Sequence, residues 1–349
     1  MLTLIYFILI LGIIVFIHEL GHFIWAKTFG VYCYEFSLGF GPKIFSFKRK
    51  NDETLYSLRA FPLGGFVSMA GEEIDDDKKV AKSKKLYNKK PYQKLIIILA
   101  GIIHNFILAI VLLFIIALIN GSTNTKSYIG IVAKDSAAEK AGIKKGDTLV
   151  KINDKKITYW DDISLQLLMV DNEKEQEFTL ITKDNKEKVI TIKPTKIEDK
   201  KGNVSYSYGI GGDQNVKKGF VPSVKYAINK FASMMKSMVV TITGLVTGKI
   251  SASNLSGPVG IYNIVGQQSK AAGFIGLVYL LAYLSVNVGF INLLPFPAFD
   301  GYRAVTICYE WITGKKVNPK VDSIVNTIGL LFLFGLMILI TIKDVIGLF

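Results

Sequence analysis

The chain has 349 residues, half of them hydrophobic, and a mean hydropathy of +0.36, which is unusual for a soluble protein. Its formal net charge is +14, but the basic residues are not interleaved with exposed aromatic residues in one compact region, which argues against nucleic-acid binding. The composition therefore indicates a membrane protein.

Four stretches are long and apolar enough to cross a hydrocarbon core about 30 Å thick, which takes roughly 20 residues per helix. They are Leu2 to Trp25, Leu95 to Ile119, Phe274 to Phe299 and Ile324 to Ile342. The first lacks the basic start and the cleavage site of a signal peptide, so we expect it to be retained. The sequence therefore predicts a polytopic α-helical membrane protein with four transmembrane helices.

The segment between the first two spans is rich in lysine and arginine, which predicts that it is cytoplasmic. The loop over residues 121–272 is also basic, but long loops translocate largely regardless of charge. Cys33 and Cys308 both fall on the predicted cytoplasmic side, so we expect no disulfide.

Residues 36–71 read as short strands and turns that form a small β-hairpin. Its apolar residues could form an ordinary cytoplasmic core, or they could dip into the bilayer beside the helices. Composition alone favours the cytoplasmic core.

Residues 126–196 alternate short strands with one or two helices, which predicts a separate soluble α+β domain. The run from Ile129 to Ile157 closely resembles a PDZ domain. Such domains bind a peptide as an added strand, and backbone amides beside it can hold a terminal carboxylate. The resemblance implies a peptide groove at Tyr128, Ile129, Gly130 and Ile131.

Residues 224–246 are apolar enough to span marginally, but Lys225, Lys230 and Lys236 recur at near-helical spacing, which favours an amphipathic surface helix. If this segment spanned, the next span would run the other way. Asp300 would then emerge on the opposite side of the membrane from the histidines of the first span. We therefore expect a surface helix.

The first span contains His18-Glu19-Leu20-Gly21-His22, an H-E-x-x-H pattern. On a helix the two imidazoles lie one turn apart and can bind one Zn²⁺, with Glu19 beside them as a general base. Each charged residue at the centre of a span costs roughly 2.5 to 3.5 kcal/mol, so these side chains need a compensating partner such as a metal. The alternative is a polar helix end at the membrane interface.

A tetrahedral zinc site with a water position needs one more protein ligand at the same membrane depth. Glu35 lies beyond the end of the first span, and His104 lies inside the second. Asp300 ends the third apolar run on the predicted cytoplasmic side. Pro295 and Pro297 cannot donate backbone hydrogen bonds, so they unwind that region and widen the pocket. Asp300 is therefore the predicted third ligand.

Six segments follow one another in a characteristic order: HELGH in the first span, FPLGGFVSMAGE after it, LAGIIHNFILA in the second span, the PDZ-like run, SGPVGI, and NLLPFPAFDG near the third span. With these segments the sequence resembles the site-2 protease family of intramembrane zinc metalloproteases, in its bacterial branch with one PDZ domain. The resemblance covers nearly the whole chain.

The resemblance implies a zinc metalloendopeptidase that hydrolyses peptide bonds within transmembrane segments during regulated intramembrane proteolysis. It makes His18, His22 and Asp300 the ligands of one Zn²⁺, Glu19 the general base and Asn292 a substrate contact. Implied substrates are single-span membrane proteins, such as anti-sigma factors or remnant signal peptides, often shortened first by another protease. Peptide C-termini at the PDZ domain and the lipid bilayer are further implied partners, and nucleic acid is not.

Two positions depart from the family pattern. Phe299 stands where the family usually has leucine, a conservative change. His104 stands where a small or apolar residue usually precedes the asparagine matched by Asn105, and it could be a second metal or proton-relay group or a packed, neutral histidine.

The resemblance also favours a membrane-associated hairpin. We expect the hairpin around Tyr56 to Phe66 to receive an extended substrate as an added strand, with Gly64 and Gly65 permitting close backbone approach. Prolines 295 and 297 complete the expected substrate region. The PDZ domain either docks a cut substrate end or excludes substrates with large outer domains.

We expect a protein of the bacterial cell (inner) membrane whose PDZ domain is extracytoplasmic. The predicted parts, in chain order, are the first transmembrane helix 1–27, the cytoplasmic-side loop with the hairpin 28–94, the second helix 95–120, the PDZ domain 126–196, the amphipathic helix and connecting segment 215–270, the third transmembrane segment 274–303 and the fourth helix 324–348.

Two competing functions are a membrane zincin with glutamate as its third ligand and a scaffold that has lost its chemistry. No glutamate sits at matching depth on another span, which argues against the first. An intact Glu19 and Asp300 argue against the second.

Overall fold

The computed structural model describes residues 2–72, 78–198 and 204–347. Residues 1, 73–77 and 348, which the sequence assigned to the first helix, the cytoplasmic-side loop and the fourth helix, lie outside the described residues. The chain divides into two compact units, which are described separately. The helical unit comprises residues 1–112 and 255–349, and the inserted unit comprises residues 113–254.

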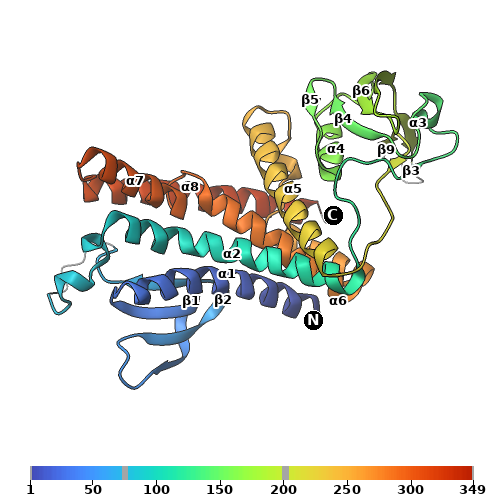
Figure 1. Cartoon of the computed structure of the whole chain (residues 1–349). Coiled ribbons are helices and arrows are strands. Elements are labelled where there is room, and N and C mark those ends of the chain that lie inside the picture. Colours follow the sequence, from blue (N-terminus) through green and yellow to red (C-terminus); the bar gives the residue numbers. More distant parts are fainter. Residues whose placement is uncertain (1, 73–77, 199–203, 348–349) are drawn as a thin grey trace. The chain divides into compact units, whose positions relative to one another are not determined.

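Four of the described helices are long and apolar enough to cross a membrane, as the sequence predicted (Figure 1). They are α1 (Leu2–Thr28), α2 (Pro91–Asn120), α6 (Pro258–Leu293) and α8 (Pro319–Ile346). The last turns of α2 belong to the inserted unit. Two short 3-10 helices, Lys82–Lys84 and Leu86–Asn88, precede α2, and a third, Ala252–Asn254, precedes α6.

Helix α6 begins earlier than the predicted third span. It has 36 residues, about 54 Å at 1.5 Å per residue, and a kink at Gly273, where φ is +59°, divides it. Residues 274–293 alone span about 30 Å, the thickness of the hydrocarbon core. Residues 258–272 are also helical because Pro258 suits a first helical position, and the backbone N–H groups of Gly257 and Gly260 donate to Asp344 of α8 at 2.8 Å each.

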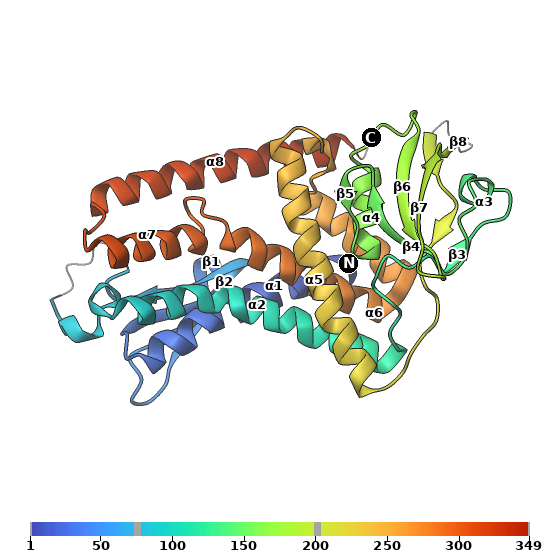
Figure 2. The same cartoon turned by 45° about the horizontal axis from the view of Figure 1, so that its top comes forward.

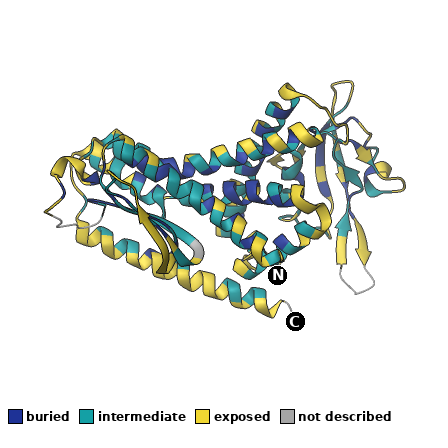
Figure 3. Cartoon of the chain, turned by 90° about the horizontal axis from the view of Figure 1, so that it is seen from below, coloured by how far each residue is buried: buried dark blue, intermediate teal, exposed yellow. Residues whose placement is uncertain are grey.

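Helices α1 and α6 form an apolar core around Phe7, Ile10 and Ile14, packed on Leu277 and Leu281. Helix α8 has few such contacts, and Figure 3 shows it exposed along most of its length. A long apolar helix with an exposed surface suits contact with lipid.

A β-sheet packs beside α1, built from strands β1 (Cys33–Lys48) and β2 (Leu55–Met69). Each strand bends and pairs twice, so that Tyr56, Ser57 and Leu58 pair with both halves of β1. Residues 65–68 pair only with the first half of β1 and form an edge. The expectation that the hairpin around Tyr56 to Phe66 receives a substrate strand is corrected for residues 56–58, which are already paired on both sides, whereas Phe66 lies on the edge.

The inserted unit is an α+β fold (Figure 2). Its elements are β3 (Ile131–Val132), α3 (Ala137–Lys140), β4 (Thr148–Ile152), β5 (Lys155–Lys156), α4 (Trp160–Leu167), β6 (Gln176–Ile181), β7 (Glu187–Ile192), β8 (Thr195–Glu198), β9 (Val204–Ser207), β10 (Ile210–Gly211) and α5 (Phe220–Val246). Strands β5-β4-β6-β7 form one antiparallel sheet, and β10 pairs with β3. The core continues past residue 196, because Tyr208 is 4% exposed and stacks on Phe178 at 5.2 Å.

The predicted peptide groove at Tyr128 to Ile131 is corrected by the pairing of β3. The N–H of Ile129 donates to Asp147, and the N–H of Gly130 donates to Gly211. Ile131 pairs with Gly211, and Tyr128 bridges to Thr148, so this segment has a partner on each side. The chain directly after β10 instead approaches α4, because a Cβ on Gly212 would lie 3.1 Å from the Trp160 ring.

Helix α5 uses its lysines to contact α4. Lys230 pairs with Asp161 at 2.7 Å, and Lys236 pairs with Asp162 at 2.5 Å. These two lysines thus form ion pairs within the inserted unit, and the position of α5 at a membrane surface stays a prediction. The first turn of α4 offers opposite charges, where acidic side chains are also favoured by the helix dipole.

Candidate metal centre

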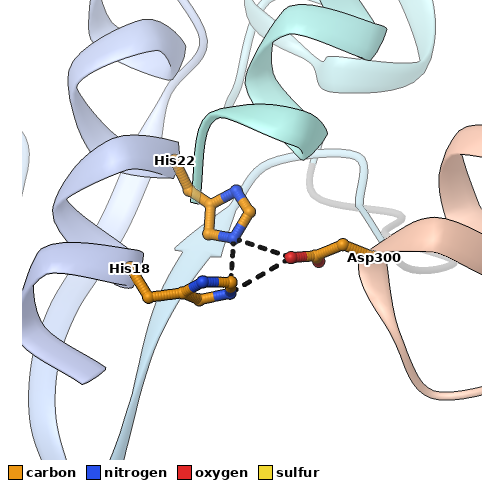
Figure 4. A group of neighbouring side chains, drawn as sticks. All are labelled: His18, His22 and Asp300. Atoms are coloured by element: carbon orange, nitrogen blue, oxygen red, sulfur yellow. Dashed lines mark hydrogen bonds and ion pairs between the residues drawn. The ribbon is translucent and has the colours of Figure 1, made fainter. Parts of the chain in front are cut away.

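Helix α1 places His18 and His22 one turn apart on the same face (Figure 4). Their ring centroids are 4.8 Å apart, and their Nε2 atoms are 3.2 Å apart. Both rings face α2, where Gly21 of α1 meets the backbone of Ala100 so closely that a Cβ on Gly21 would lie 2.6 Å from its carbonyl oxygen. A larger residue at position 21 would push the two helices apart.

Asp300 is the first residue of α7 (Asp300–Thr313), a helix the sequence did not predict. An acidic residue in a first helical turn is electrostatically favoured. The next residue, Gly301, packs on the end of α6, since a Cβ there would lie 2.2 Å from the carbonyl oxygen of Leu293. Because Gly301 has no side chain, α7 can begin at Asp300 in direct contact with the end of α6.

The loop before Asp300 is held in an uncommon backbone conformation. Ala298 has a φ of +77°, which is strained for a non-glycine residue, and its N–H donates to the side chain of Asn326 in α8 at 3.0 Å. A Cβ on Gly329 would lie 2.5 Å from Cβ of Pro297, so α8 approaches the loop closely. The prolines thus shape the loop, as expected, and α8 fixes it.

The three predicted ligands converge. Oδ2 of Asp300 lies 3.1 Å from Nε2 of His18 and 3.3 Å from Nε2 of His22 (Figure 4). Within residues 2–72, 78–198 and 204–347, this is the single group of three or more metal-ligating side chains. It contains no glutamate, so the alternative of a glutamate ligand finds no support there.

The residues present fit a zinc ion. Ligand atoms about 2.0 to 2.1 Å from a tetrahedral zinc are about 3.3 Å from one another, close to the three observed separations. Nδ1 of His22 must carry a proton, because it lies 2.8 Å from the carbonyl oxygen of Ile97, so Nε2 of the neutral ring is a free acceptor. Oδ2 of Asp300 is buried without a hydrogen bond. Two neutral imidazoles and a carboxylate that converge through acceptor atoms suit a bound cation.

A cavity of about 410 Å³ opens beside this group, lined in part by Glu19, Gly64, Gly65, Glu72, Asn292 and Arg303. The predicted general base and the predicted substrate contact Asn292 therefore share a space with the metal ligands. Pro295 and Pro297 do not line it, although the neighbouring Ala298 does.

The backbone of the sheet edge lies close to Glu19. A Cβ on Gly65 would lie 2.8 Å from the carbonyl oxygen of Ser37 and 3.2 Å from Cγ of Glu19. A Cβ on Gly64 would overlap the Phe40 ring. Gly65 therefore allows the strand to lie against α1 beside Glu19, and Gly64 leaves room for the Phe40 ring.

An ion pair between Glu72 and Arg303 lies at the same cavity, and sequence reasoning missed it. Glu72 ends the FPLGGFVSMAGE segment, and Arg303 lies one turn after Asp300. The pair connects the chain after β2 with the helix that carries the third ligand. Nothing local in either segment signals a partner more than 200 residues away.

Two residues considered from the sequence lie outside the metal group. Nδ1 of His104 donates to the carbonyl oxygen of Ala100 in its own helix at 2.8 Å, which favours a packed histidine. Glu35 is engaged by Arg59, Lys43 and Ser57. Burial alone would raise the pKa of Glu35, but hydrogen bonds from Ser57, Arg59 and Lys43 outweigh it and lower that pKa.

Comparison with known families decides the class of this protein, because the family described as peptidase family M50 matches residues 6–336. The chain belongs to peptidase family M50. A relative from Clostridium acetobutylicum that bears a zinc metalloprotease name is 39% identical, with 97% of this chain and 96% of the relative covered. The "Regulator of sigma-W protease RasP" of Bacillus subtilis is 32% identical, with 99% of both chains covered. The "Zinc metalloprotease RasP" of Bacillus licheniformis is 33% identical over the same shares.

Membership of family M50, together with these relatives, makes the protein a zinc metalloendopeptidase with a Zn²⁺ cofactor. Its four long apolar helices agree with a multi-pass membrane protein. The sequence resemblance to site-2 proteases is thereby confirmed at the level of the family.

Proposed function

We propose that this M50 protease hydrolyses peptide bonds within transmembrane segments of other membrane proteins, with His18, His22 and Asp300 as its zinc ligands. The observation that carries the proposal is the convergence of these three side chains beside one cavity, two of them on a helix long and apolar enough to cross a membrane. A metal centre within such a helix suits substrates that lie in the bilayer.

The chain's own residues supply the acid–base chemistry. When bound, zinc polarises the scissile carbonyl and lowers the pKa of water toward 7. Glu19 accepts a proton from the attacking water and returns it to the leaving amine. Asn292 donates a hydrogen bond to the substrate backbone or to the developing oxyanion. Both residues line the cavity next to the three ligands.

Substrate must be extended, because the peptide groups of a helix are already hydrogen-bonded within it. We place it along the edge formed by residues 65–68 as an added strand. Two features support this placement: the edge pairs on one side with β1, and Gly65 brings its backbone close to Glu19. The exposed side chains of Phe40, Ile44 and Phe45 agree with a sheet that dips into lipid.

For the inserted unit we propose a PDZ-like role on the extracytoplasmic side of a bacterial cell (inner) membrane. A substrate end would lie between β10 and α4, or the unit would exclude substrates with large outer domains. The support is the antiparallel β3–β10 pair next to the start of α4. As substrates we propose single-span proteins already shortened by another protease. The name of the Bacillus subtilis relative suggests regulators of sigma factors among them, and remnant signal peptides are a second class.

Co-expression with a doubly tagged single-span reporter tests the proposal. We expect the unaltered protein to convert a pre-shortened reporter, whereas Glu19→Gln accumulates the full-length form, with a rate loss of about 10² to 10⁴-fold. Glu175→Gln, on an exposed part of the inserted unit, is the matched control and should cleave normally. Equal cleavage by the unaltered protein and Glu19→Gln would remove the proposed mechanism.

A further inference from the structure

Helix α2 buries an amide side chain, Asn105, that the mechanism above does not use. Asn105 is fully buried on a helix that is otherwise almost entirely apolar in its middle. A buried amide without partners is costly, so its surroundings should explain it. Its amide group lies 3.4 Å from Nδ1 of His18.

The chemistry of His18 decides which amide atom faces the ring. If the NH₂ group of Asn105 donated to Nδ1, the neutral imidazole would carry its proton on Nε2, the atom that faces Asp300 and His22. A protonated Nε2 cannot bind zinc. That orientation would also leave Oδ1 of Asn105 buried without a donor. With the oxygen toward His18, Nδ1–H donates to Oδ1, and Nε2 is free for the metal.

His22 is held in the same way by the same helix. Its Nδ1–H donates to the carbonyl oxygen of Ile97. Ile97, Gly101 and Asn105 follow at intervals of four residues and therefore lie along one face of α2. A Cβ on Gly101 would lie 2.5 Å from Nε2 of His22 and 2.8 Å from Cε1 of His18. The face thus presents an acceptor, a glycine that makes room for both rings, and a second acceptor.

Asn105 is also anchored from α6. The hydroxyl of Ser285, which is fully buried, donates to the backbone carbonyl of Asn105 at 2.9 Å. This contact holds the turn of α2 that faces His18. The position of the amide is therefore set by three helices that pack around the metal group.

We propose that Asn105 is a positioning residue of the metal centre, whose side-chain oxygen accepts the Nδ1–H of His18 and directs Nε2 toward the zinc ion. The inference rests on the proposed ligand set. It assigns a role to the second-span segment LAGIIHNFILA, in which Gly101 and Asn105 face the two histidines.

Zinc affinity of the purified full-length protein, measured by competition with a chromophoric chelator, tests this role. Loss of an outer-shell partner of a metal ligand typically weakens metal binding 10- to 100-fold. We expect that loss in Asn105→Leu, which has similar volume and no acceptor. Asn105→Asp keeps an acceptor oxygen and should bind zinc within about threefold of the unaltered protein. His104→Gln, on the adjacent residue and outside the metal group, is the matched control and should not change the affinity.

If Asn105→Leu does not fold, Asn105→Ser replaces it, because the shorter serine hydroxyl does not reach the position of the amide oxygen. Unchanged zinc affinity in the folded leucine or serine variant would overturn the proposal, as would an equal loss in Asn105→Asp and Asn105→Leu. Absence of zinc from the unaltered protein is a different outcome, because it would remove the ligand set itself.

Discussion

The metal group and the sheet edge share one cavity but present different chemistry. At the metal group, side chains of α1 and α7 converge, with separations of 3.1 to 3.3 Å among their ligand atoms. At residues 65–68, Gly65 brings a backbone edge toward Glu19. The comparison teaches that the two regions tolerate different changes. The reaction depends on which side chains stand at a few positions, whereas substrate binding depends on where the backbone of one strand lies.

The strongest way to break this comparison is to remove a metal ligand. We expect His22→Ala to reduce bound zinc from about one ion per chain to a trace and to abolish cleavage, because two protein ligands remain of three. Zinc content by mass spectrometry and reporter cleavage measure the two effects. A variant that cleaves without zinc would show that the metal group is not the reaction centre.

A change at the sheet edge should act differently. Gly65→Ala must move the strand, because its Cβ would lie 2.8 Å from the Ser37 carbonyl oxygen. We expect cleavage to be several-fold slower, mainly because KM is higher, and we expect the zinc content to be unchanged. Gly12→Ala on α1 is the matched control, since nothing lies within 4 Å of its added Cβ, and it should behave as the unaltered protein. A loss of zinc in Gly65→Ala would show that the sheet edge and the metal group are not independent.

The smallest effect concerns the buried thiol of Cys33, the first residue of β1. Burial raises the pKa of Cys33 to about 12, so the thiol stays neutral and is inaccessible at pH 8. We expect a thiol reagent at this pH to label the partly exposed Cys308 and to leave Cys33 unlabelled until the protein is denatured. Rapid native labelling of Cys33 would mean that the sheet does not pack beside α1 as described.

The same contrast explains which features could be predicted from the sequence. His18, Glu19, His22 and Asp300 were predictable because ionisable side chains are conspicuous in apolar spans and a metal needs a fixed set of donors. The strand edges were not. The partner of β3 lies about 80 residues further along the chain, so the predicted peptide groove fell on a segment that is already paired.

Helix packing limited the prediction in a similar way. The segment LAGIIHNFILA was visible, but the contact of Asn105 with His18 joins positions 87 residues apart. Helix α7 begins directly after a proline-containing loop, and its start depends on the packing of Gly301 against α6. Such features follow from how helices approach one another, which local patterns do not reveal.

X-ray absorption at the zinc edge of the purified protein addresses the ligand set itself, with Asp300→Ala measured alongside. We predict a four-coordinate spectrum with two imidazole nitrogens and oxygen ligands at about 2.0 to 2.1 Å in the unaltered protein, and loss of the bound ion or of one oxygen ligand in the variant. An ion bound with a single imidazole, or identical spectra from the two proteins, would contradict the proposed set of zinc ligands.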